Sequence, residues 1–208
     1  MSAMLPLATE YCAAIQFRNG RNLGMRKPLL TSEQSIHFYT AIGRALMASF
    51  ADSYVGQLRR VVGCRLLLVP GARIVIENSK AEVLLQKRSD FDVWGLPGGN
   101  AEEGENLEVT IAREVTEETG LELVEYKPFG FGCDPLIETF TFPNGDRCQY
   151  FVLSYFSRSF RGVPRVGDDE STAVRWFSVE ALPPMLPNML KSVKAYLEFS
   201  RSGEFQMI

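Results

Sequence analysis

The sequence predicts an α/β fold in which a mixed β-sheet packs against helices, preceded by a partly helical N-terminal extension. Candidate strands are interleaved with a few helices, and a polar turn joins two of these strands as a hairpin, which argues against a doubly wound parallel sheet. Apolar residues at helical spacing come before the first strand. We therefore expect an extension at residues 1–60 and a compact domain at residues 61–208.

The extension contains one clear helical pattern. Thr31 can cap the start of a helix, because Gln34 follows three residues later, as a capping box requires. One long helix fits the pattern, and so do two helices separated by a break between Ser49 and Ser53. Apolar residues recur at helical spacing before Gly63, at Ile36, Tyr39, Ile42, Leu46, Phe50, Tyr54, Val55 and Leu58.

The domain begins near Leu66 and consists of strands separated by polar turns and a few helices. Polar turns at 78–80 and 143–146 connect neighbouring strands, the second of them as a hairpin. A helix is predicted at 107–119, ended by Gly120, and a short one at 178–182 behind a Ser178 cap. A last helix runs from Pro187 to about Ser200, with Leu190, Val193 and Leu197 on one face. The predicted strands are 73–77, 82–87, 121–126, 137–142, 148–157 and 173–177.

The composition is that of a globular protein that neither enters membranes nor depends on disulfides. Hydrophobic residues make up 46% of the chain and charged residues 23%, and the net charge is −3, so nucleic acid is not the expected partner. No apolar run is long enough to span a membrane. The 4 cysteines form no C-x-x-C pair and the single histidine, His37, lies apart from them. We therefore expect reduced thiols in a cytoplasmic protein, and no zinc site.

Three carboxylates gather near the end of the helix predicted at 107–119. Glu114, Glu117 and Glu118 are spaced i, i+3 and i+4, so they project over an arc of roughly 100°. Like charges at this spacing destabilise a helix, and the helix dipole disfavours acids in the last turns. A divalent cation such as magnesium would explain the arrangement, because it binds carboxylate oxygens. Arg113 can pair with one of these acids and hold the cluster in shape.

The segment that contains these acids, GNAEEGENLEVTIAREVTEETGL at 99–121, resembles the Nudix box, G-x5-E-x7-R-E-U-x-E-E-x-G-U, in which U is a bulky aliphatic residue. The run WGLPGG at 94–99 resembles the usual approach to the box, and DESTAVRWFSVEALP at 169–183 resembles the closing strand and helix of the domain. The resemblance covers about residues 66–185 and leaves the first 60 residues unmatched. Every fixed position of the box is filled, by Gly99, Glu105, Arg113, Glu114, Val115, Glu117, Glu118, Gly120 and Leu121.

The resemblance implies a Nudix α/β/α sandwich that carries a metal-dependent hydrolase. It assigns the binding of Mg2+, or of Mn2+, to Glu114, Glu117 and Glu118, with the carbonyl of Gly99 completing the ligands. Glu105 and Arg113 would organise the loop and the helix.

The reaction that the resemblance implies is attack of a metal-activated water on a P–O–P bridge. The substrate would be a nucleoside diphosphate linked to another group, either a nucleoside or deoxynucleoside triphosphate or a nucleoside diphosphate sugar. Homodimers are common in the family, so we expect a homodimer that binds a small nucleotide.

Residues around the metal-binding set are open to more than one interpretation. A box glutamate is the leading candidate for the general base, Glu170 in the loop before the last strand is a second, and Glu138 is a weaker third. Arg88 either contacts a substrate phosphate or forms a surface salt bridge. Trp94, like Phe91, either stacks on a nucleobase or fills the core.

Two other functions fit parts of the pattern. A catalytically silent Nudix-like module would sense a nucleotide without hydrolysing it, but such modules usually lose box glutamates, and all of them are present here. Diphosphate isomerisation, also found on this fold, needs a catalytic cysteine and extra histidines, whereas His37 lies outside the domain.

Overall fold

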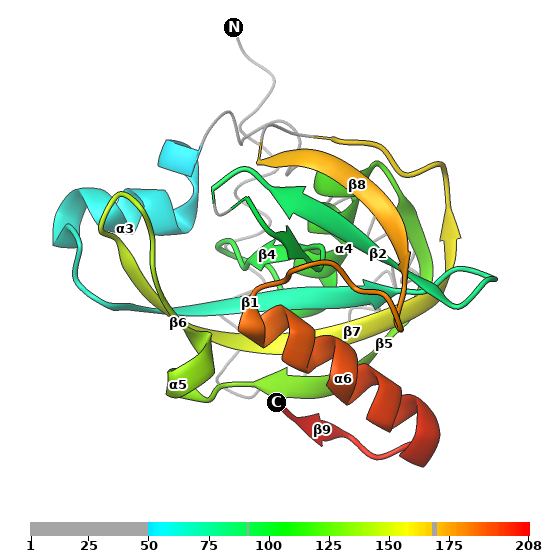
Figure 1. Ribbon diagram of the computed structural model, residues 1–208. Helices are drawn as coiled ribbons and strands as arrows, with labels where there is room; N and C mark the ends of the chain where they lie inside the picture. The colour runs from blue at the N-terminus through cyan, green and yellow to red at the C-terminus, as the bar shows by residue number, and fades with distance from the viewer. Residues whose placement is uncertain (1–49, 91, 168–169) are drawn as a thin grey trace, which may run out of the picture. The chain divides into compact units, whose positions relative to one another are not determined.

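A mixed sheet around strand β1 (Leu67–Ile76) forms the centre of the domain (Figure 1). The computed structural model describes residues 50–90, 92–167 and 170–208. Strand β1 lies parallel to β7 (Arg147–Arg161) and antiparallel to β4 (Gly98–Asn100). Within the described residues the strand order is β4-β1-β7-β5-β9, and β6 also pairs with β7, with β5 at Glu122–Gly132, β6 at Thr139–Thr141 and β9 at Gln206–Met207.

A smaller sheet has the order β3-β2-β8 within the same described residues. Strand β2 (Glu82–Arg88) is antiparallel both to β3 (Trp94–Gly95) and to β8 (Ser171–Ser178). The predicted polar turn after β1 carries the chain from the larger sheet to this one. Asn78 shapes the turn, because its side-chain oxygen accepts hydrogen bonds from the backbone N–H groups of Lys80 and Glu82, at 2.8 and 3.0 Å.

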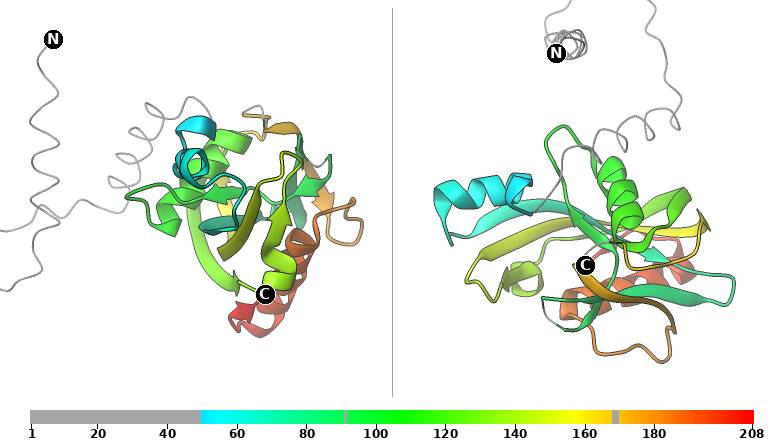
Figure 2. Two further views of the ribbon diagram at one scale, coloured as in Figure 1. Left: turned by 90° about the vertical axis from the view of Figure 1, so that its left-hand side faces the viewer. Right: turned by 90° about the horizontal axis from the view of Figure 1, so that it is seen from above.

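Helices α4 (Leu107–Thr119) and α6 (Pro187–Ser202) cover opposite faces of the larger sheet (Figure 2). Side chains alternate along β1, so that Ile74 faces α4 and Val75 faces α6. The α4-side cluster contains Ala72, Ile74, Ile76, Leu84, Ile111, Val115, Leu121 and Tyr155, with Trp176 against it. The α6-side cluster contains Val75, Val83, Leu85, Leu96, Phe129, Val193, Tyr196 and Ile208, with Trp94 against it. The α/β/α arrangement expected from the resemblance is confirmed.

Part of the predicted extension packs on the domain. A 3-10 turn at Phe50–Asp52 precedes helix α3 (Tyr54–Val62), and the side chain of Ser53 caps α3 by accepting from Gly56 N at 3.1 Å. Because the backbone of Ser53 is extended, the helical pattern is interrupted at this residue, and α3 ends at Gly63, where φ is 59°. The helix predicted from Thr31, together with His37 and Cys12, lies outside the described residues.

Several predicted boundaries were wrong. Residues 137–138 were assigned to a strand, but they belong to a short helix, α5 (Pro135–Glu138), because Asp134 caps it and Pro135 fits its first turn. Ser178 does accept from Glu180 N, at 3.3 Å, but the chain makes a single turn there and no helix.

The buried face of α6 also differs from the prediction. It is formed by Asn188, Ser192, Val193 and Tyr196, whereas Leu197 is 41% exposed. Polar contacts with buried Arg73 turn the helix in this way, since its guanidinium donates to Asn188 O and Ser192 Oγ. Among the described helices, none is both long enough and apolar enough to cross a bilayer.

Candidate active site

Helix α4 holds its acidic side chains beside the α4-side cluster. Asn106 caps its first turn by accepting from Val109 N at 2.9 Å, and Gly120 ends it in the left-handed conformation, at φ 69°. Buried Ile111 and Val115 fix the apolar face of the helix against the sheet. The helix bounds and the role of Gly120 were predicted, so the box acids lie on the helix as expected.

The segment after β7 is bound to the end of α4. The backbone N–H groups of Arg165 and Gly167 donate to the carbonyls of Thr119 and Glu118, at 2.9 and 3.0 Å, and satisfy acceptors that every helix end leaves open. A Cβ atom on Gly167 would lie 1.8 Å from the carbonyl oxygen of Glu117, so only glycine allows this approach. The chain then reaches Glu170, whose carbonyl accepts from the backbone and the hydroxyl of Ser89.

Glu118 is a buried carboxylate, only 2% exposed, that points between β2 and β4. One oxygen accepts from Gln86 Nε2 at 2.7 Å and the other from the backbone N–H of Gly98 at 2.8 Å. Gln86 is held in turn by the hydroxyl of Ser171, which donates to its Oε1 at 2.8 Å. This chain of contacts ties the box helix to both sheets and fixes the direction of the Glu118 carboxylate.

Arg113 is the centre of an acidic cluster. Its buried guanidinium pairs with Glu105 at 2.8 Å, Glu114 at 2.9 Å and Glu117 at 3.0 Å. It also donates to the carbonyl of Asn100 at 3.1 Å, which anchors the loop between β4 and α4. The side chain that the sequence assigned to loop and helix organisation therefore contacts both of them.

Two glycines leave room for the acids. A Cβ atom on Gly99 would lie 2.2 Å from Glu114 Oε1, so a side chain at 99 would displace the Glu114 carboxylate. On the neighbouring strand, a Cβ atom on Gly71 would lie 2.8 Å from the carbonyl oxygen of Gly99. The glycine at 99 therefore lets the Glu114 carboxylate approach β4, and the glycine at 71 lets β1 approach the Gly99 carbonyl.

The surroundings strongly perturb two of the acids. Burial raises the pKa of Glu114 to about 7, although Arg113 opposes the shift, and the charges of Glu117 and Glu170 add to it. Burial also raises the pKa of Glu118 well above its ordinary value, with the charge of Glu114 as the next cause. Glu105 differs, because its contacts with Arg113 outweigh burial and lower its pKa. Two neighbouring carboxylates thus resist carrying negative charge together.

The remaining candidates lie in different surroundings. Arg88 pairs with Asp90 at 2.7 Å. Burial would lower the pKa of Arg88, but the contact with Asp90 and the charges of Glu118 and Glu170 raise it. Trp94 packs edge-on against Phe177, with ring centroids 4.7 Å apart, in the α6-side cluster. Phe91 lies outside the described residues.

Glu138 lies on the α6 face of the sheet, away from the box helix. It is 1% exposed and pairs with buried Arg73 at 2.7 Å, while Asn188 Nδ2 donates to the same carboxylate oxygen at 3.0 Å. Because α4 covers the other face, the structure does not bring Glu138 to the acidic cluster.

This arrangement is that of a known family. Residues 67–197 of the chain match the sequence model of the NUDIX domain family, and this range includes the whole box. The chain belongs to the Nudix family. With every fixed residue of the Nudix box present, it is a Nudix pyrophosphohydrolase.

Similar proteins include bacterial and animal members. A putative 8-oxo-dGTP diphosphatase of Bacillus subtilis is 30% identical over 128 residues, which cover 61% of this chain and 78% of that protein. The 8-oxo-dGDP phosphatase NUDT18 of Danio rerio is 30% identical over 136 residues, 63% of this chain but only 39% of that longer protein. The structure of a MutT Nudix hydrolase from Burkholderia pseudomallei aligns with a TM-score of 0.53 and 26% identity, over 62% of this chain and 98% of that one.

The Nudix box has the donor chemistry for a divalent cation. Glu114 and Glu118 are carboxylates whose pKa values are raised by burial and, after it, by neighbouring negative charge, and a bound cation would favour their charged forms. In the described part of the chain, no three acidic, histidine or cysteine side chains yet converge as a metal-binding group. The contacts above explain this, because Arg113 holds Glu114 and Glu117 while Gly98 and Gln86 hold Glu118. Carboxylate oxygens are hard ligands of the type that magnesium prefers, so these residues are suited to binding it.

The sequence interpretation missed the partners of the box acids. Gln86 is the clearest omission, since it fixes Glu118 from β2. The available sign was a polar residue directly after the apolar, buried run VLL at 83–85. Thr110, which donates to Glu105 at 3.0 Å, and Glu102, which contacts α3, gave no comparable sign.

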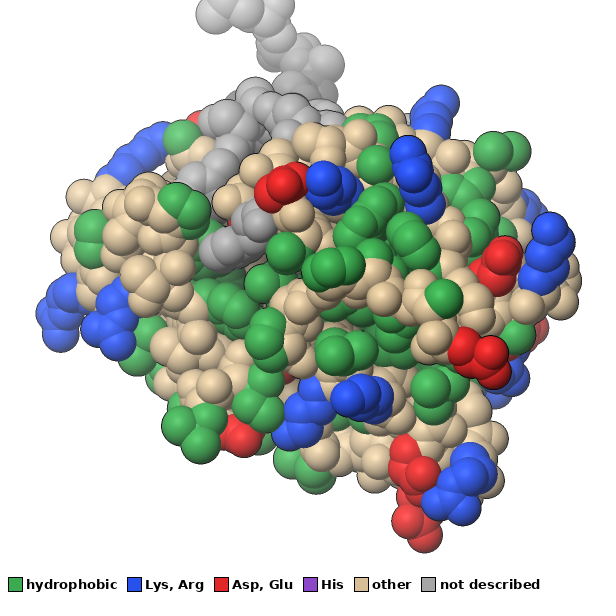
Figure 3. Space-filling view, in the orientation of Figure 1, with side chains coloured by type: hydrophobic (Ala, Val, Ile, Leu, Met, Phe, Trp, Pro, Cys, Tyr) green, Lys and Arg blue, Asp and Glu red, His purple; other side chains and the backbone are tan. Residues whose placement is uncertain are grey.

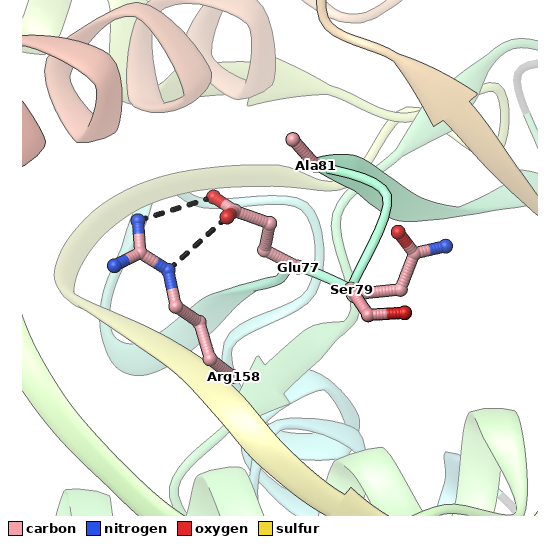
Figure 4. A pocket seen from close by; sticks show the side chains of 5 residues that line it. Glu77, Ser79, Ala81 and Arg158 are labelled. Carbon is pink, nitrogen blue, oxygen red and sulfur yellow. Dashed lines mark hydrogen bonds and ion pairs between the residues drawn. The ribbon is translucent and has the colours of Figure 1, made fainter.

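A pocket at the other end of β2 contains none of the Nudix box. Glu77, Asn78, Ser79, Ala81 and Arg158 line it. Figure 4 shows Glu77 and Arg158 joined across it, with 3.1 Å between Arg158 Nε and Glu77 Oε1. The Tyr196 hydroxyl also donates to Glu77, at 2.6 Å. The charges in this pocket are already paired with one another, so it is not the site of hydrolysis.

Proposed function

We propose that this Nudix protein hydrolyses the pyrophosphate bond of a nucleoside diphosphate linked to another group, in a reaction that requires Mg2+ and that Mn2+ also supports. The observations that carry the proposal are the pairing of Glu114 and Glu117 with Arg113 and the hydrogen bond from the backbone N–H of Gly98 to Glu118. Gly99, next to Gly98 on β4, leaves room for the Glu114 carboxylate. Glu114, Glu117 and Glu118 would hold the cation with the carbonyl of Gly99. When bound, magnesium neutralises phosphate oxygens and lowers the pKa of a coordinated water.

The chain's own residues would divide the remaining work. Arg88, whose pKa is raised by the charges of Glu118 and Glu170 as well as by Asp90, can exchange its contact with Asp90 for a substrate phosphate. A box glutamate would accept the proton of the attacking water. Glu170 is the second candidate, because its charge lies near enough to raise the pKa of Glu114. One P–O bond forms to the water oxygen and the bridging P–O bond breaks, which releases a nucleoside monophosphate when the attack is at the α-phosphorus.

Among the two substrate classes, we favour a nucleoside or deoxynucleoside triphosphate over a nucleoside diphosphate sugar. The name of the Bacillus subtilis relative, a putative 8-oxo-dGTP diphosphatase, supports this choice. The Danio rerio relative is named for a deoxynucleoside diphosphate, 8-oxo-dGDP, which supports a nucleotide without a sugar attached to its phosphates. Trp94 adds no support for base stacking, since its ring packs on Phe177.

A substrate panel tests the proposal. The protein is assayed with Mg2+ and with Mn2+ against nucleoside triphosphates, nucleotide sugars, dinucleoside polyphosphates and capped RNA, and Glu118→Gln serves as the inactive reference. Pyrophosphate release from a triphosphate is the expected result. If the protein cleaves only the nucleotide sugars, to a nucleoside monophosphate and a sugar phosphate, the substrate is a nucleoside diphosphate sugar instead. If no member of the panel is cleaved although nucleotides bind, the silent nucleotide-sensing module replaces the enzyme.

We also propose that the protein acts in the cytoplasm as a homodimer. The free thiols of Cys64, Cys133 and Cys148 among the described residues are consistent with a reducing compartment. Exposed apolar side chains support self-association, including Leu68 at 65% and Leu136 at 93% exposure. Figure 3 shows apolar side chains across the face that is turned to the viewer in Figure 1. Light scattering of the purified protein measures the assembly directly.

A further inference from the structure

Helix α3 contacts the loop of the Nudix box through the carboxylate of Glu102. The backbone N–H of Tyr54, the first residue of α3, donates to Glu102 Oε2 at 2.8 Å. Glu102 lies in the loop between β4 and α4, and 48 residues separate the two partners along the chain. A carboxylate at this end of a helix is favoured, because the first N–H groups are unpaired and the helix dipole is positive there.

Helix α3 is itself fixed to the domain elsewhere. Arg59 donates to the carbonyls of Arg65 and Arg147, to its own helix end at Gly63, and to the sulfur of Cys148. Val55, which is 3% exposed, packs with Val69 and Cys148. The partner of Glu102 is therefore a helix that two independent contacts hold against the β6–β7 hairpin and β1.

On the loop side, Glu102 is joined directly to the acidic cluster. Its backbone N–H donates to Glu105 Oε2 at 3.2 Å, and its carbonyl accepts from Glu105 N at 3.0 Å. Glu105 binds Arg113 through both carboxylate oxygens, and Arg113 pairs with Glu114 and Glu117. The contacts thus run without a gap from α3 to two proposed metal ligands.

We propose that Glu102 is a positioning residue, through which α3 holds the box loop and the Glu105–Arg113 pair in the arrangement that binds the metal. This inference rests on the proposed function. It makes α3, which lies before the family match at residues 67–197, part of the working enzyme. Residues that orient metal ligands typically contribute about 10- to 100-fold to metal affinity.

The test compares Glu102→Ala with Glu103→Ala, a change at the exposed neighbouring acid. Binding of Mn2+ to the full-length protein is followed by electron paramagnetic resonance. We expect the Mn2+ dissociation constant to rise about tenfold or more in Glu102→Ala, with no change in Glu103→Ala and with the KM for substrate unchanged at saturating metal. Glu102→Gln should restore binding in part, since its amide oxygen can still accept from Tyr54. An unchanged Mn2+ affinity in Glu102→Ala would overturn the proposal.

A second variant tests whether α3 is the other partner. Arg59→Met loosens α3 from the hairpin without touching the box. If α3 acts through Glu102, the double variant Arg59→Met/Glu102→Ala has the same Mn2+ affinity as the single variant that binds Mn2+ less tightly. If the loss of Mn2+ affinity in the double variant equals the product of the two single losses, the two residues act independently and the inference is contradicted.

Amide hydrogen exchange separates this inference from the proposed function. In Glu102→Ala, the amides of Tyr54 and of residues 101–106 should exchange faster than in the wild type, whether or not metal is bound. If the wild-type protein neither binds Mn2+ nor cleaves the panel, the proposed function fails, and the exchange rates alone decide whether the contact between α3 and the loop holds. Unchanged exchange at Tyr54 would overturn that contact.

Discussion

Glu118 combines burial, fixed direction and crowding with another acid. Gln86 and Gly98 orient its two oxygens, and its neighbour Glu114 raises its pKa further. Groups perturbed by burial together with a nearby like charge are characteristic of functional sites. Its position on the box was predictable from the motif, but its partners depend on how β2 lies against α4.

We predict that Glu118→Gln lowers kcat by about two orders of magnitude or more while the fold persists. A glutamine can keep both contacts if the Gln86 amide turns over, because the Ser171 hydroxyl can either donate or accept. The measurement is steady-state hydrolysis beside a thermal unfolding curve, with Glu108→Gln on the exposed side of α4 as control. Near-normal turnover would remove Glu118 from the catalytic residues.

Glu114 gives the metal-free protein a specific pH dependence. Its pKa is about 7 in the folded state against an ordinary 4.5, so the folded chain retains a proton that the unfolded chain releases. The stability that this proton contributes is complete below the ordinary pKa and is lost as the pH rises through about 7.

We therefore predict that Glu114→Gln becomes more stable relative to wild type as the pH is raised from about 5 to about 8 without metal. Urea unfolding of both proteins at the two pH values measures the difference. Added Mg2+ should stabilise the wild type selectively at the higher pH. A constant difference between the two proteins across this range would show that Glu114 is not perturbed.

At the scale of elements, local rules predicted most of the structure, and long-range contacts explain the exceptions. The bounds of α4, the break before Ser53 and the hairpin around Gly145 follow from capping and turn residues. The sequence did not indicate that the strands before and after Asn78 enter different sheets, because this depends on the pairing of β1 with β7. Strand β9 escaped prediction, since it is short and its pairing with β5 is non-local.

The contact between β1 and α6 was also beyond sequence patterns, which treat an arginine in a strand as exposed. Arg73 is 4% exposed and pairs with Glu138, whose other oxygen is buried without a hydrogen-bond partner among the described residues. Removing one member of a buried pair leaves an uncompensated charge, which costs more than removing both.

We predict that Arg73→Met lowers the free energy of unfolding by about 3–5 kcal/mol. The double variant Arg73→Met/Glu138→Leu should recover much of that loss. Urea unfolding measures both values, and turnover per folded molecule should stay close to wild type, because Glu138 lies across the sheet from the box. A loss below about 1 kcal/mol in the single variant would show that water reaches the pair.

At the scale of the molecule, β2 joins the two layers. Leu84 enters the α4-side cluster, while Val83 and Leu85 enter the α6-side cluster. The residues of both clusters, and those of α3 with the cluster around Val55, lie within 52–208.

We predict that a chain starting at Asp52 unfolds at the same temperature as the full-length protein, within about 2 °C. Calorimetry checks this, and light scattering of both proteins shows whether residues 1–51 contribute to assembly. The same number of subunits in both proteins would exclude such a contribution. A markedly lower unfolding temperature would instead mean that the first 51 residues stabilise the folded domain.

The two layers also carry separate optical reporters. The sequence has 2 tryptophans, and they lie on opposite sides of the smaller sheet: Trp94 with the α6-side cluster and Trp176 with the α4-side cluster. Trp176 stacks on Phe160 with ring centroids 5.6 Å apart, whereas Trp94 meets Phe177 edge-on. Replacing either indole by phenylalanine leaves fluorescence from one layer alone. The emission of each single-tryptophan protein would then reveal whether loosening at helix α4 spreads through β2 to the far side of the fold.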